Sequence, residues 1–177
     1  MEENCIIHHY ILANEIISQC DTVKVETMCF KALQKRAKET KISESTGKFI
    51  RKKRFGKSLA NKAPSMFLVI LKNKMRARGG LYLEVDTYSL KSSQYNHLNE
   101  EYCKKKLSQR WNHFEYKGDK IRIQRDLYSS YLIKNVKNDL KTIDNESCVK
   151  GFEMFLNLHD KEIDRLSASK NLSSIGI

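Results

Sequence analysis

Apolar residues recur three or four positions apart in several stretches of the chain, which is the spacing of an amphipathic helix. The clearest case begins at Pro64, a residue suited to a first helical turn, and stops at Gly79-Gly80. The same spacing predicts further helices at residues 4–19, 126–137 and 149–166.

Two short segments alternate apolar and polar residues, which is the period of a β-strand. One is Val23–Glu26 and the other is Leu81–Asp86, and both end in a carboxylate. Between them we expect a basic helix at 28–40 and a basic loop or hairpin at 41–57, because glycine and serine interrupt the lysines there.

From Thr87 to Gly118 the chain is polar and aromatic without a sustained period. We expect an irregular insertion here, with a small hairpin over Phe114–Ile123 that turns on Lys117-Gly118-Asp119. Trp111 and Phe114 are expected to pack in a small core of this insertion.

The composition is that of a folded domain, with 177 residues of which 40% are hydrophobic and 31% charged. The five cysteines include no C-x-x-C pair, so we expect reduced thiols and a cytoplasmic protein. The longest apolar run, Met66–Leu71, is far shorter than the roughly 20 residues of a membrane span. Glu2 and Glu3 argue against a secretory signal.

The formal net charge is +12, and most of the excess lies in one segment, Lys31–Lys57. Lysine and arginine that neutralise phosphates release counterions, so this segment predicts salt-dependent binding to nucleic acid. A solvated helix face or a disordered basic arm is the alternative interpretation. The candidate phosphate contacts are Lys31, Lys35, Arg36, Lys38, Arg51, Lys52, Lys53, Arg54 and Lys57.

The expected elements follow the order of the second half of an RNase H-like fold, with a carboxylate ending the first strand and Asp126 heading a later helix. In this order the chain resembles the RuvC-type domain of the OrfB/TnpB transposase proteins of bacterial insertion sequences, which are related to type V CRISPR effector nucleases. The resemblance covers about residues 6–135. It is carried by His8-His9-Tyr10, Ala13–Ile17, Val23–Leu33, Ala63–Phe67, Gly80–Asp86 and Gln124–Ser130.

The resemblance implies an α/β protein with an incomplete, helix-rich RNase H-like (RuvC-type) fold. Residues 1–86 would form the second half of its core, including the basic helix and loop at 28–57. Residues 87–120 would form an irregular insertion in place of the family's zinc ribbon, and 121–177 the final core helix and a C-terminal helix.

The family commonly builds its zinc ribbon from paired C-x-x-C motifs, one of which follows Ser-Gln. Here Ser93–His97 contains Ser-Gln without a cysteine, and Cys103, His97 and His113 are too scattered for a convincing site. We therefore expect no zinc. The aromatic residues of the insertion, together with Lys104–Lys106, would suit contact with a single nucleic-acid strand.

The resemblance implies that Glu26 and Asp126 are the second and third of three acids that hold Mg²⁺ or Mn²⁺ for phosphodiester cleavage. The pattern alone also allows a solvent-facing strand end for Glu26 and a plain helix cap for Asp126. The family's first acid lies on a strand before the helix at 4–19, and we expect this chain to lack it.

The leading hypothesis is therefore a C-terminal fragment of a transposon-encoded TnpB-like transposase that binds DNA, and guide RNA with it, in transposition and DNA recombination. Alone it would be catalytically incomplete. One alternative is a metal-dependent DNA endonuclease completed by a separate N-terminal fragment. Another is a non-enzymatic RNA-binding adaptor. No membrane partner is expected.

Overall fold

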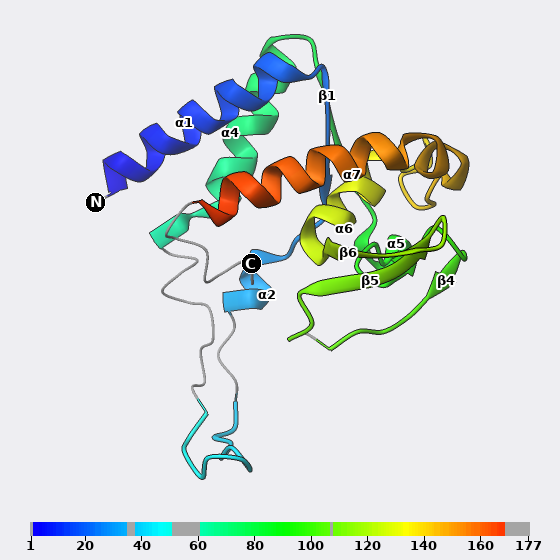
Figure 1. Cartoon of the computed structure of the whole chain (residues 1–177). Coiled ribbons are helices and arrows are strands. Elements are labelled where there is room, and N and C mark those ends of the chain that lie inside the picture. Colours follow the sequence, from blue (N-terminus) through cyan, green and yellow to red (C-terminus); the bar gives the residue numbers. More distant parts are fainter. Residues whose placement is uncertain (1, 35–37, 51–60, 107, 169–177) are drawn as a thin grey trace. The chain divides into compact units, whose positions relative to one another are not determined.

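The computed structural model describes residues 2–34, 38–50, 61–106 and 108–168 as a mixture of helices and small two-stranded sheets (Figure 1). The chain is an α/β protein in this general sense. It divides into two compact units, one of Met1–Val23 with Met28–Leu83 and one of Lys24–Thr27 with Glu84–Ile177.

The first unit is built on two of the predicted helices, α1 (Glu2–Gln19) and α4 (Pro64–Ala77), which pack against each other. Ala13 of α1 is fully buried against α4, where Leu71 and Met75 are the most buried side chains. The apolar surface of α1 is wider than the part that α4 covers. Its exposed apolar residues are Ile6, Ile7, Tyr10, Ile11 and Leu12.

The end of α4 depends on a close approach at Gly80. The Gly80 N–H donates a hydrogen bond of 2.8 Å to the Met75 carbonyl oxygen. A Cβ atom at Gly80 would lie 2.7 Å from Met75 Cε and 3.0 Å from the carbonyl oxygen of Asp21, so a larger residue does not fit there without a shift. The Gly79-Gly80 stop is thus confirmed, and the next strand begins one residue later.

Both predicted strands are present, as β1 (Thr22–Glu26) and β2 (Leu81–Val85), and they pair with each other. The Leu81 N–H donates to Asp21 O, and the Thr27 N–H donates to Val85 O. β2 ends one residue before the prediction because the Asp86 carboxylate caps the short helix α5 (Thr87–Leu90), accepting from two backbone N–H groups of that helix.

The basic segment that follows β1 contains less helix than predicted. Its described helix, α2, covers only Phe30–Gln34, and residues 38–40 are not helical. Ile42 and Phe49 form an antiparallel bridge, which agrees with a hairpin in the predicted loop.

The insertion in the second unit is more ordered than predicted. It contains a small pair of strands, β3 (Tyr95–Asn96) and β4 (Glu101–Tyr102), and a longer hairpin of β5 (Trp111–Tyr116) and β6 (Asp119–Gln124). The predicted turn is confirmed: Lys117 and Gly118 have φ angles of 54° and 87°, the conformation of a two-residue hairpin turn.

An aromatic core joins this hairpin to the last two helices, α6 (Arg125–Lys134) and α7 (Asn145–Ser167). The Phe114 ring lies 5.0 Å from that of Tyr128 on α6. Phe114 therefore packs in a core, as expected. Trp111 is half-buried, and the guanidinium carbon of Arg122 lies 3.8 Å from the centroid of the Trp111 ring.

His97 is a buried polar residue within this aromatic core and is only 1% exposed. The Tyr128 hydroxyl accepts a hydrogen bond from the His97 backbone N–H and lies 2.7 Å from His97 Nδ1. His97 Nε2 has no partner among the described residues. Burial lowers the pKa of His97 to about 4.

This buried histidine predicts a specific acid sensitivity of folding. Because the His97 pKa is lower in the folded chain than its unfolded value of 6.5, its contribution is complete above pH 6.5 and is lost as the pH falls toward 4. We expect His97→Phe to remove about 2–3 kcal/mol of the stability difference between pH 7.5 and pH 4.5, measured by urea unfolding.

The matched control is His113→Gln, since His113 is an exposed histidine of the same unit, on β5. It should leave the pH dependence of unfolding unchanged. An identical pH dependence in wild type and His97→Phe would contradict the assignment.

Candidate functional site

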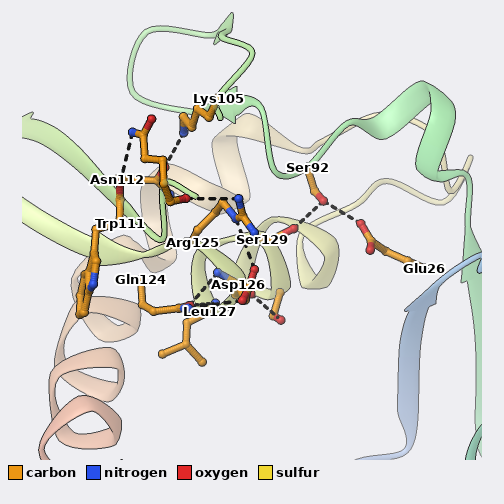
Figure 2. Close-up of polar contacts among 12 residues, drawn as sticks. Glu26, Ser92, Lys105, Trp111, Asn112, Gln124, Arg125, Asp126, Leu127 and Ser129 are labelled. Atoms are coloured by element: carbon orange, nitrogen blue, oxygen red, sulfur yellow. Dashed lines mark hydrogen bonds and ion pairs between the residues drawn. The ribbon is translucent and has the colours of Figure 1, made fainter. Parts of the chain in front are cut away.

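Glu26 is the last residue of β1 and is half-buried. Its Oε1 accepts a hydrogen bond of 2.9 Å from the hydroxyl of Ser92, which is only 2% exposed. The Ser92 hydroxyl oxygen also lies 2.6 Å from that of Ser129 on α6. Figure 2 shows the Glu26 and Ser129 side chains meeting at Ser92.

The direction of these two hydrogen bonds follows from the proton count. A hydroxyl carries a single proton, and a carboxylate can only accept. Ser92 therefore donates to Glu26, and Ser129 donates to Ser92. The carboxylate of Glu26 is thus connected to α6 through one buried serine.

Asp126 lies in the first turn of α6 and is not its cap. The Gln124 side-chain oxygen takes that role, accepting from the Asp126 N–H at 2.6 Å and the Leu127 N–H at 2.8 Å. The interpretation of Asp126 as a plain helix cap is therefore wrong. Its side chain is 57% exposed, and its carboxylate oxygens lie 3.4 Å from Gln124 Nε2 and 3.4 Å from Arg125 Nε.

Ser129 and Asp126 lie on the same face of α6, because residues three apart on a helix are neighbours. The Glu26–Ser92–Ser129 contacts therefore bring the end of β1 to the helix face that carries Asp126. Both predicted site acids belong to this one region of the second unit. We call Glu26, Ser92, Asp126 and Ser129 the acidic site.

A second residue of β1 fixes the other end of α6. The Lys24 ammonium donates to the carbonyl oxygens of Lys134 and Val136, at 3.0 and 2.6 Å, where the helix leaves its carbonyls without partners. Burial lowers the pKa of Lys24, although Asp144 opposes the shift. Alternate residues of a strand point to the same side, so Lys24 and Glu26 both face α6.

The first turn of α6 is held in place by backbone contacts as well. The Gln124 N–H donates to Nε2 of His159, a buried residue of α7, at 3.0 Å. The Arg125 N–H donates to the carbonyl oxygen of Arg110 at 2.9 Å. These contacts fix the start of the helix, and with it the backbone position of Asp126.

The donors of the acidic site fit Mg²⁺ or Mn²⁺ in chemical type, because these ions prefer carboxylate oxygen. Glu26 and Asp126 are the residues that would hold such an ion. Within the described part of the chain, no group of three or more His, Cys, Asp or Glu residues is placed to bind a metal. Glu26 and Asp126 are thus two candidate carboxylate ligands, fewer than such a group.

The candidate phosphate contacts are only partly described. Lys31 and Lys38 are exposed. The remaining candidates lie outside the described residues, and they are Lys35, Arg36, Arg51, Lys52, Lys53, Arg54 and Lys57.

Sequence reasoning did not find the residues that assemble the acidic site. Ser129 carried a usable signal, since it lies three positions after Asp126 on a predicted helix. Lys24 is a polar position of an alternating strand, a pattern that normally indicates solvent. Ser92 lies in a segment without a period, and nothing in the sequence marked it.

Searches against protein-family models, curated proteins and solved structures found no match to this chain. No helix in the described ranges is long and apolar enough to cross a membrane.

The buried link between Glu26 and α6 predicts a measurable cost when it is removed. Ser92→Ala deletes the donor to the carboxylate and the acceptor for Ser129, so it should lower the free energy of unfolding by about 1–3 kcal/mol. Urea unfolding at neutral pH measures this change. Ser93→Ala, at the exposed neighbouring serine, should cost almost nothing, and equal effects of the two substitutions would refute the link.

Proposed function

We propose that this chain is a nucleic-acid-binding, RuvC-like portion of a TnpB-type protein. In this proposal the basic segment at residues 31–57 contacts phosphates, and Glu26 and Asp126 are two of the carboxylates that hold Mg²⁺ or Mn²⁺. The bound nucleic acids are DNA and a guide RNA. The finer RNase H-like fold is part of the same proposal.

The observation that supports it most is the hydrogen-bonded chain from Glu26 through Ser92 to Ser129. The resemblance named Glu26 and Asp126, which are 100 positions apart in the sequence, as members of one site. A buried serine connects the first to the helix face of the second. A chance similarity of short segments gives no reason for such a connection.

The charge distribution supports the binding part of the proposal. The formal net charge of +12 is concentrated in a segment that directly follows Glu26. The described members Lys31 and Lys38 are exposed, as a phosphate contact requires.

A salt series on DNA binding tests this proposal. Binding to a single-stranded oligonucleotide, measured by fluorescence anisotropy, should weaken steeply as salt rises. Replacing Lys52, Lys53 and Arg54 by glutamine should lower the slope of log K against log salt by about 2, because three phosphate contacts are lost.

The control variant replaces three lysines of the second unit, Lys120, Lys137 and Lys161, which are exposed. It removes the same charge and should leave the slope nearly unchanged. Binding that is insensitive to salt, or equal loss in both variants, would show that the basic segment does not contact phosphate.

A nuclease completed by a second polypeptide is the other candidate function, and the exposure of Asp126 favours it. An acid that is 57% exposed and free of the capping role is accessible to a ligand. Co-expression with the upstream reading frame should then give Mg²⁺-dependent cleavage of DNA. Glu26→Gln should abolish this cleavage, and activity that survives the substitution would remove Glu26 from the site.

A further inference from the structure

A polar pocket lies in the insertion of the second unit, and its lining contains none of the residues of the acidic site. It has a volume of about 630 Å³. Its lining comes from described residues in the ranges 94–106 and 109–114. This is within the usual range for pockets that hold small ligands. Among its lining side chains are the amides of Gln94, Asn96, Asn99, Gln109 and Asn112.

Lys105 is a half-buried cation at the wall of this pocket. Its ammonium donates a hydrogen bond of 2.5 Å to Asn112 Oδ1 (Figure 2). The ammonium also lies 5.6 Å from the centre of the Phe114 ring. Burial lowers the pKa of Lys105; Arg125 lowers it further, and Cys103 opposes the shift. The ammonium is thus partly desolvated and lies near a second cation. A bound anion would stabilise its charged form.

Asn112 provides the second and independent observation. Its side chain is only 1% exposed, and its Nδ2 has no hydrogen-bond partner among the described residues. A buried amide N–H without an acceptor costs free energy, and such groups are rare in folded proteins. The partner that Nδ2 lacks is a hydrogen-bond acceptor, and the oxygen atoms of an anion are acceptors.

The charge of the lining has the sign that an anion requires. Lys104 and Lys106 flank Lys105, and Glu101 is the carboxylate among the described lining residues. Glu101 Oε2 already accepts a hydrogen bond of 2.7 Å from Asn99 Nδ2. The pocket therefore combines an excess of positive charge with one buried donor, Asn112 Nδ2, that has no acceptor among the described residues.

We propose that this pocket binds a phosphate group carried by a ligand of about the size of one nucleotide. Lys105 and Asn112 Nδ2 donate to the phosphate oxygens, and the remaining amides face the rest of the ligand. The phosphate belongs either to a free nucleotide or to one unit of a bound strand. The proposal needs neither the acidic site nor the segment at 31–57, so it goes beyond the function proposed above.

The experiment is an NMR titration of the ¹⁵N-labelled chain with inorganic phosphate, adenosine 5′-monophosphate and adenosine. Phosphate and the monophosphate should give saturable shifts at the backbone amides of residues 94–114, and adenosine should not. Lys105→Gln should raise the dissociation constant for the monophosphate at least tenfold, because the substitution removes a charged donor. Lys120→Gln, at an exposed lysine outside the pocket lining, should bind as wild type does.

Two further arms make the result decisive. A Lys104→Gln, Lys106→Gln double variant changes only exposed side chains, so we expect it to keep the fold. It should still weaken binding of the monophosphate. A trinucleotide identifies the source: shifts with it alone mean a strand phosphate, and shifts with the monophosphate mean a free nucleotide. Glutamine at Lys52, Lys53 and Arg54 should leave these shifts intact, which separates this proposal from the basic segment.

The proposal is overturned if none of the phosphate-bearing probes gives saturable shifts at residues 94–114. It is also overturned if adenosine shifts them equally, or if Lys105→Gln binds the monophosphate as tightly as wild type while its spectrum shows a folded chain.

Discussion

The contact between the polar side of β1 and helix α6 is the interaction on which the acidic site depends. Lys24 holds the carbonyl end of the helix, and Glu26 reaches its other half through Ser92. Burying either charge without a hydrogen-bond partner would cost free energy. Both residues therefore favour the helix position in which these hydrogen bonds form. The position of Asp126 relative to the end of β1 follows from these contacts.

Helix α6 serves the insertion as well as the acidic site. Its Tyr128 supports Phe114 of β5 and binds buried His97, while Ser129, the next residue, turns toward Ser92. Asn112 and Phe114 lie two positions apart on β5 and share the buried side of that strand. The wall of the polar pocket therefore shares, through Phe114, the aromatic core that contains Tyr128 of α6.

Local patterns were enough to predict the long helices, both strands of the first sheet and the turn at Lys117-Gly118. These features depend on periodicity and on residues with special backbone freedom, which a single sequence displays. The strands β3 and β4 have only two residues each, too few to show a period. The sequence pattern allowed Asp126 as the cap of α6 because aspartate often caps helices, whereas the Gln124 side chain caps it.

The candidate site was predictable only in part, and for a physical reason. Glu26 and Asp126 could be named from the resemblance, but their connection depends on Ser92, a buried serine far from both in the sequence. Hydrogen bonds between distant segments leave no periodic trace along the chain. For the same reason, Lys24 resembled a solvent-facing position although its ammonium group is bound to the end of α6.

The most direct measurement is a titration with paramagnetic Mn²⁺, followed by NMR line broadening in the wild-type chain and in Glu26→Gln. If Glu26 and Asp126 share one metal site, the amides beside both residues should broaden together at low Mn²⁺ concentration, and the substitution should weaken both sets. Broadening at one of the two positions alone, or at neither, would contradict the account.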